Sequence, residues 1–203
     1  MDIFYYGGLS MNIETNQEQF FEEMSSLKRD IMEALSSENV EKYRGEYKGK
    51  YSPERFKENF IEKATLHIVF KYVLIRMIEE TMKRVNVKLN DEGLEKWRGM
   101  SKNFRTDYNI LYKIAENDVK REKDLGEIFR EAIYDQNEFI DKSENIIVNY
   151  IPLLSKYDFS TLDANITLTL IDSLYSVEKR EELQKFYKPS TIIDYLLQQL
   201  GLI

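Results

Sequence analysis

LHIVFKYVLIRMIEE, residues 66–80, decides the fold of this 203-residue chain. Apolar side chains stand at almost every helical angle in this stretch, instead of lining one face. A helix of this kind is stable only when neighbouring elements cover it on several sides. The pattern therefore predicts a central helix surrounded by others. Ser52 as N-cap and Pro53 at the first helical position mark its start, and we expect it to end near Arg84.

Amphipathic segments flank this stretch on both sides. Thr15 and Glu18 predict a capping box that opens a helix over residues 16–36, and Ser160 with Asp163 predicts another helix start. NIIVNYIPLL, residues 145–154, fits a helix or a strand, and we favour a helix because a single strand would have no partner. Further stripes at helical spacing are formed by Phe104, Tyr108, Leu111, Tyr112 and Ala115, by Leu125, Ile128, Phe129, Ala132 and Ile133, and by Ile166, Leu170 and Leu174.

Composition agrees with an all-helical chain. Hydrophobic residues make up 42% of it and charged residues 32%, with only 3 Pro and 8 Gly. Few helix breakers and many helix formers favour helices over strands. We therefore predict the all-α class, as an irregular multi-helix bundle of about seven helices. The chain has no Cys, which excludes disulfides, thiolate metal sites and a Cys nucleophile, and fits a cytoplasmic protein.

The charge balance limits the partners of the chain. Its formal net charge is -7, so we do not expect it to grip nucleic acid strongly by itself. No apolar run is long enough for a membrane span. The most basic region is 96–123, where aromatic residues lie between the cations. A solvated helix face explains this region best, while the alternative is a phosphate-contacting surface whose DNA-binding candidates are Lys96, Arg98, Lys102 and Arg105.

No catalytic motif is present in the sequence. The only His, His67, falls within the most buried predicted helix and fits a core histidine better than a catalytic base. Three pairs of adjacent glutamates occur, and neighbours on a helix point about 100° apart. We expect these pairs to lie on solvated faces, and we name no catalytic residue and no metal ligand. The pairs are Glu22–Glu23, Glu79–Glu80 and Glu181–Glu182.

The segment YDFSTLDANITLTLIDSLYSVEKREELQKFYKPSTIIDYLL, residues 157–197, carries a more specific signal. Its Asp158-Phe159-Ser160 turn, the stretch 175–180 and the Phe186-Tyr187-Lys188-Pro189 turn follow one another as in a known family. The segment resembles the lead into the catalytic domain of N6-adenine DNA methyltransferases of restriction-modification and related phage-defence systems, including type I modification subunits and fused type II enzymes. Residues 67–80 look like that family's early core helix.

This resemblance implies a cofactor. In the family the second turn helps to form the S-adenosylmethionine pocket, so Phe186, Tyr187, Lys188 and Pro189 are the implied cofactor-binding residues. A helix N-terminus offers free N–H groups to a carboxylate such as the methionine tail. The chain departs from the family pattern here, with Lys188 at the place of a threonine that would cap the helix. Gln184 and Thr191 replace a glycine and an acid in the same way.

The family's cofactor loop and its Asn-Pro-Pro-Tyr motif are absent from residues 1–203. The resemblance therefore implies an N-terminal domain that cannot methylate DNA alone, with an arm at 1–14, a helical domain at 15–183, and a linker turn and first helix at 184–203. Its expected partners are DNA, a catalytic methyltransferase domain and a specificity or restriction subunit.

We expect the face carrying Ile192, Leu196 and Leu200 to meet the catalytic domain and to be poorly covered without it. The rival hypotheses are a stand-alone helical protein-interaction adaptor without a cofactor and, less favoured, a small helical enzyme with an unrecognised site.

Overall fold

The protein is described here from a computed structural model. The structure describes residues 10–45, 48–82, 84–100, 108–122, 125–129, 133–135, 137–174, 177–185, 192, 195–196 and 198. In this part of the chain there are seven α-helices and one two-stranded sheet, which confirms the predicted all-α class. The helices are α1 (Gln17–Leu35), α2 (Pro53–Thr81), α3 (Asp91–Met100), α4 (Tyr108–Arg121), α5 (Asn137–Leu154), α6 (Ala164–Leu174) and α7 (Val177–Lys185).

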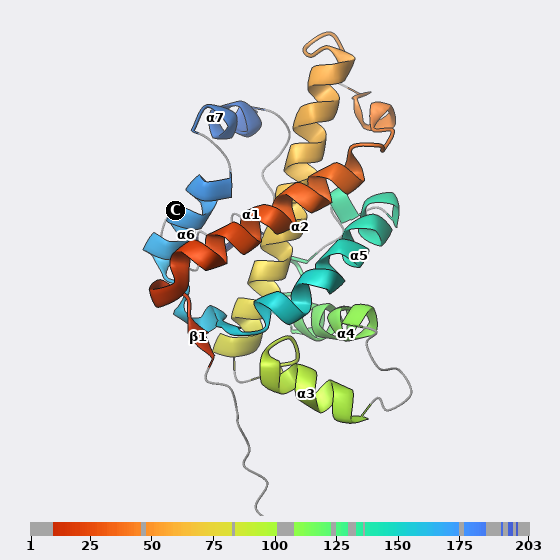
Figure 1. Cartoon of the computed structure of the whole chain (residues 1–203). Coiled ribbons are helices and arrows are strands. Elements are labelled where there is room, and N and C mark those ends of the chain that lie inside the picture. Colours follow the sequence, from red (N-terminus) through yellow and green to blue (C-terminus); the bar gives the residue numbers. More distant parts are fainter. Residues whose placement is uncertain are drawn as a thin grey trace, which may run out of the picture.

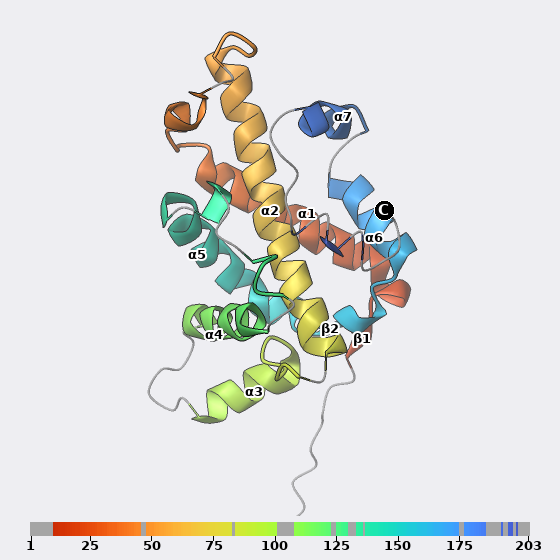
Figure 2. The same ribbon diagram turned by 180° about the vertical axis from the view of Figure 1, so that it is seen from behind.

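The long helix α2 is the axis of the molecule (Figure 1). Helix α1 crosses it and also packs against α5 and α6, while α4 and the 3-10 turn η5 (Phe159–Thr161) contact α2 directly. Seen from behind, α2 passes between α5 and α4 on one side and α6 and α7 on the other (Figure 2). Its residues from Ala64 to Arg76 are buried without interruption. The prediction of a helix covered on several sides is therefore confirmed.

One of the predicted helix starts is confirmed and another is wrong. Ser52 does cap α2, because its hydroxyl accepts the backbone N–H of Arg55 at 3.2 Å and Pro53 is the first helical residue. The capping box at Thr15 is wrong. The short 3-10 turn η1 (Glu14–Asn16) precedes α1, and the Thr15 hydroxyl donates to the Asn12 carbonyl instead of accepting from α1.

The start of α6 and the end of α2 differ from the prediction. Asp163, and not Ser160, caps α6, since its carboxylate accepts the N–H of Ile166 at 2.8 Å. Helix α2 ends at Thr81, three residues before the predicted end.

The ambiguous segment and one predicted helical stripe have different outcomes. NIIVNYIPLL is helical, as favoured, and forms the C-terminal part of α5 with Pro152 inside its last turn. The stripe from Leu125 to Ile133 does not form an α-helix in its described residues. Leu125–Phe129 are turns, and the 3-10 turn η4 (Ile133–Asp135) follows.

Both ends of the described chain join the bundle. Strand β1 (Met11–Asn12) pairs in parallel with β2 (Tyr157–Asp158), so part of the expected arm belongs to the fold. Ile192 and Leu196 are buried in the core. The expectation that their face would be uncovered is wrong for these two residues, and Leu200 lies outside the described residues.

Candidate functional site

A buried guanidinium joins the C-terminal half of α2 to the segment after α5. Arg76 is completely buried and forms an ion pair with Glu80 one turn further on. It donates to the carbonyl of Leu154 at 3.1 Å and to that of Tyr157 at 3.0 Å. Its guanidinium carbon also lies 4.4 Å from the centre of the Phe159 ring. An Arg fork can serve several acceptors at once, and here it ties the end of α5 and strand β2 to α2.

The carboxylate of Glu80 completes this contact from the other side. One of its oxygens pairs with Arg76, and the other accepts the backbone N–H groups of Phe159 and, at 3.2 Å, of Ser160. Asp158 holds the same turn locally by accepting the N–H of Ser160 at 2.9 Å. The turn Asp158-Phe159-Ser160 is thus fixed on α2 by charge-assisted hydrogen bonds. We call Arg76, Glu80 and this turn the Arg76 junction.

Glu79 binds a different loop, because it points about 100° away from Glu80. Its two carboxylate oxygens accept the N–H groups of Lys88 at 3.2 Å and Leu89 at 3.1 Å. Burial raises the pKa of Glu79 to about 7, although these backbone bonds and nearby Arg76 act to lower it. The prediction that Glu79 and Glu80 lie on a solvated face is wrong, since Glu79 is 2% exposed and the Glu80 side chain 9%.

A second buried ionic cluster lies midway along α2. Lys71 pairs with Glu116 of α4 at 2.6 Å and with Asp135 at 3.0 Å, and His67 Nε2 is 3.3 Å from both Asp135 oxygens. Burial alone would raise the pKa of Asp135, but hydrogen bonds and charge from His67 and Lys71 outweigh it and hold that pKa below its usual value. His67 therefore lies in a core ionic cluster of α2, α4 and η4.

A third polar contact binds α7 to the N-terminal half of α2. Asn59 is completely buried, and its amide nitrogen donates to Glu182 at 2.7 Å while its amide oxygen accepts from Lys179 at 2.7 Å. Arg55 adds an ion pair to Glu182 at 2.5 Å. We call Asn59, Arg55, Lys179 and Glu182 the Asn59 clamp. Sequence patterns did not identify these residues. The signal that could have identified them was Asn59, a polar residue beside the apolar face of the central helix.

Lys28 supports the same region from α1. Its ammonium group pairs with Glu62 of α2 and donates to the carbonyl of Leu174, the last residue of α6, both at 2.5 Å. A cation at a helix C-terminus satisfies a carbonyl that has no partner within the helix. The end of α6 is thereby held between α1 and α2, directly before α7.

The predicted DNA-binding residues are only partly described. Lys96 and Arg98 lie on α3, whereas Lys102 and Arg105 fall outside the described residues. Lys96 pairs with Glu92 at 2.6 Å, and Arg98 donates to the Tyr108 hydroxyl at 2.9 Å. Two positions apart on a helix, these side chains point to different sides, so α3 does not bring them together.

The other described cations of the 96–123 region are paired as well. Lys113 contacts Glu144, Lys120 contacts Glu116, and Arg121 lies 3.9 Å from Asp118. Each pair reduces the positive potential that a phosphate backbone would meet. This neutralisation agrees with the favoured interpretation of a solvated helix face.

A surface groove of about 440 Å³ lies between α3, α4 and the loop before α3. Three of the exposed large apolar residues lie along these two helices: Met100, which is 75% exposed, Ile110 and Ile114. The lining consists of Asn86, Val87, Lys88, Asn90, Glu92, Gly93, Lys96, Trp97, Met100, Leu111 and Ile114. A groove with an apolar floor and polar rim is suited to bind a protein segment.

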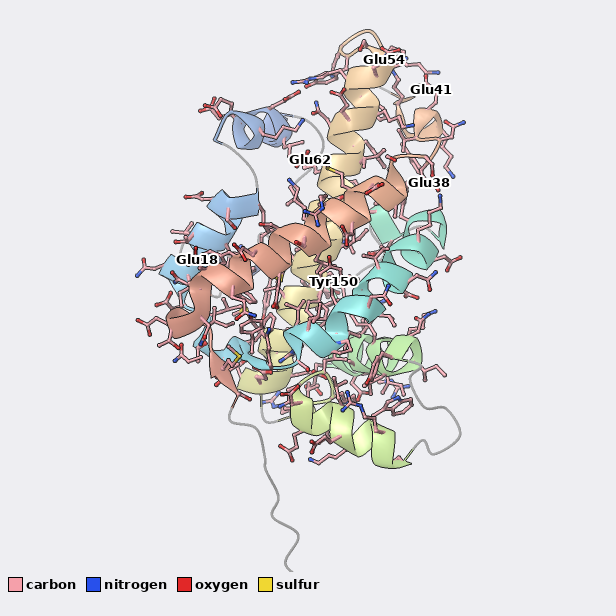
Figure 3. All side chains as sticks on the ribbon, viewed as in Figure 1. Glu18, Glu38, Glu41, Glu54, Glu62 and Tyr150 are labelled. Carbon is pink, nitrogen blue, oxygen red and sulfur yellow. The ribbon has the colours of Figure 1, made fainter. Side chains whose placement is uncertain are left out.

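Several glutamates lie on the face that carries α1. Figure 3 shows Glu18 on α1, Glu38 and Glu41 after its end, and Glu54 and Glu62 on α2. Three of them have a cation partner, since Glu38 pairs with Lys142, Glu41 with Arg44 and Glu62 with Lys28.

The predicted cofactor residues Phe186, Tyr187, Lys188 and Pro189 lie outside the described residues. The nearest described element is α7, which ends at Lys185. Within the described part of the chain, no three His, Cys, Asp or Glu side chains are grouped so as to hold a metal ion. None of the described helices combines the length and apolar character needed to traverse a lipid bilayer.

Comparison with known proteins finds no relative of this chain. No protein-family model matches the chain, and neither the curated proteins nor the solved structures contain a significant match.

Proposed function

We propose that this chain is the N-terminal helical domain of an adenine-specific DNA methyltransferase of a restriction-modification system. In this role it contributes to DNA clamping or subunit contact and to the edge of the S-adenosylmethionine site. The methyl transfer itself belongs to a catalytic domain outside residues 1–203. The adenine must leave the duplex for this chemistry, so a second surface that holds the backbone has a physical purpose.

The observation that carries the proposal is the Arg76 junction. Residues 67–80 and the segment that starts at Tyr157 each resemble the same family, and they are far apart in the sequence. The junction joins them directly, through Arg76 to Tyr157 and through Glu80 to Phe159, which is 79 positions away. The contact agrees with a single domain that carries both similarities.

The path from the junction to the implied cofactor edge is short. After η5 the chain forms α6, whose last carbonyl accepts from Lys28, and then α7, which the Asn59 clamp holds on α2. Lys185 ends α7 directly before Phe186. The helical domain would therefore present the Phe186–Pro189 turn from a fixed base, as a shared cofactor edge requires.

The deciding experiment reads the coding sequence beyond Ile203 and measures S-adenosylmethionine binding by the whole gene product with calorimetry. We expect a cofactor loop, an Asn-Pro-Pro-Tyr motif and saturable binding. Tyr187→Ala should weaken that binding, while Tyr150→Ala, a distant tyrosine on α5, should leave it unchanged. A gene product without these motifs, or one that does not bind the cofactor, would refute the proposal.

The DNA-contact part needs a separate test. Each phosphate contact changes the slope of log affinity against log salt by about 0.9. If Lys96 and Arg98 contact the DNA backbone, the double variant Lys96→Gln/Arg98→Gln of the whole gene product loses one or two such contacts. If its slope and affinity equal those of the wild type, these two residues are not part of the DNA interface.

One observation favours the alternative, a helical protein-interaction adaptor. It is the groove beside Trp97, whose lining includes exposed Met100 and Ile114. An adaptor needs no cofactor, so a gene product that ends at Ile203 and fails to bind S-adenosylmethionine would make this function the leading one. Under that outcome, Met100→Asp should weaken partner binding while preserving the fold, because Met100 is largely exposed.

A further inference from the structure

Helix α7 has little apolar surface to hold it on the bundle. Its sequence is VEKREELQK, and among its described side chains only Leu183 is buried. Burying one leucine gives limited stabilisation, and it does not fix where along α2 the helix rests. The position of α7 must therefore depend strongly on its polar contacts.

The Asn59 clamp supplies contacts that do depend on position. Lys179 and Glu182 are three residues apart, so they share one face of α7. The cation meets the oxygen of the Asn59 amide and the carboxylate meets its nitrogen, both at 2.7 Å. Sliding α7 by one residue would break both hydrogen bonds and leave a fully buried amide unsatisfied.

We propose that Asn59 is a positioning residue, whose buried amide fixes α7 along α2 and thereby sets the place of Lys185, directly before Phe186. The link to a cofactor edge at Phe186–Pro189 rests on the proposed function. The fixing of α7 along α2 does not depend on the proposed function. A single buried polar residue that is satisfied in only one alignment sets the register of two helices in the same way as in coiled coils.

The test is residue-level hydrogen exchange of the 203-residue chain, which requires no cofactor and no DNA. Asn59→Leu keeps the size of the side chain and removes both hydrogen-bonding ends. We expect exchange protection of α7 to fall about tenfold or more while α5 keeps its protection, because α7 then opens locally. The matched control is Glu181→Gln, an exposed glutamate next to Glu182, which should leave α7 unchanged.

A charge-swap series keeps Asn59 intact and guards against a variant that fails to fold. Lys179→Glu places a hydrogen-bond acceptor against the amide oxygen of Asn59. Glu182→Lys places a donor against its amide nitrogen. The double variant Lys179→Glu/Glu182→Lys lets the amide turn over and form both bonds again, since its oxygen and nitrogen are similar in size. We expect the double variant to protect α7 better than either single variant, although Arg55 then faces a cation. Lys179 and Glu182 also lie 3.6 Å apart as an ion pair within α7, and the swap restores that pair too. The same series is therefore repeated in Asn59→Leu, where a recovery that depends on the amide should be absent.

Each result of these experiments leads to a different conclusion. Unchanged α7 protection in Asn59→Leu would overturn the proposal. If Asn59→Leu weakens all helices equally, the swap series decides, and a double variant no better than the singles would also overturn it. A recovered double variant together with a gene product that does not bind S-adenosylmethionine would leave the positioning role intact and remove only the proposed function.

Discussion

The two halves of α2 hold their neighbours in different ways. At the C-terminal half, the Arg76 junction places a fully buried guanidinium against two backbone carbonyls, a carboxylate and the Phe159 ring. At the N-terminal half, the Asn59 clamp holds α7 with one buried amide and side chains that are partly exposed, such as Arg55 at 51%. One helix therefore carries a deeply buried connection at one end and a partly exposed one at the other.

The difference lies in what surrounds the polar groups. Phe159 also packs edge-on against Phe20 and Tyr72, so the junction is enclosed by aromatic core. The clamp has Leu183 as its buried apolar neighbour on α7. Hydrogen bonds shielded from water are stronger, and their loss leaves buried groups unpaired, whereas water can replace exposed ones.

The largest effect is expected at the junction. Arg76→Leu leaves Glu80 as a buried charge without its partner and two carbonyls without their donor, so the free energy of unfolding should fall by about 3–5 kcal/mol. Urea denaturation measures this, with Arg29→Leu, a largely exposed residue of α1, as the control. A stable Arg76→Leu protein would show that the aromatic packing alone makes the connection.

The next effect depends on pH. Glu79 has a folded-state pKa raised from 4.5 to about 7, so between these values the folded state binds the proton more tightly than the unfolded state. The stability that this group contributes is therefore present at low pH and is lost as pH rises toward 7, by up to about 3 kcal/mol. Glu80 and Glu144, whose pKa values burial also raises, act in the same direction. Glu79→Gln should flatten, but not abolish, the fall in melting temperature between pH 5 and pH 7, because Glu80 and Glu144 also contribute to it. An unchanged slope would exclude Glu79 as its source.

A smaller effect concerns the start of α2. Ser52→Ala removes the cap and should lower the free energy of unfolding by about 1 kcal/mol. Thr15→Ala is the informative companion, since the sequence predicted a cap there and the structure does not use it. It should cost less than half as much. Equal losses in the two variants would mean that the Thr15 cap forms in solution.

The smallest expected effect is a difference in salt dependence between the Asn59 clamp and the Arg76 junction. Raising the salt concentration screens the half-exposed Arg55–Glu182 pair, so exchange of α7 should become about two- to fivefold faster. The backbone amide of Phe159 should not respond, because Phe159 and Arg76 are completely buried and Glu80 is nearly so. If both regions respond equally, the contrast between them is wrong.

Sequence patterns identified the helices better than their polar contacts. The run of residues 66–80 predicted a buried central helix because periodicity depends only on neighbouring residues. Arg76 and Tyr157 are 81 positions apart, and no local pattern announces their contact. The glutamates at 79 and 80 were predicted to be solvated because acidic pairs usually are, and tertiary contacts outweighed that tendency. A charge within an otherwise apolar helix was the available warning, since such a charge must find a partner when buried.

The parallel pairing of β1 with β2 has a consequence for how the protein is made. Ile13, which is fully buried, donates its N–H to Thr161 across 148 positions of the chain. At about 5–20 residues per second, a ribosome needs roughly seven to thirty seconds to deliver the second residue after the first. Until then β1 lacks its partner strand, although α1 can already pack against α2 and α5. The pairing that joins the two ends of the bundle must therefore form after most of the chain has emerged.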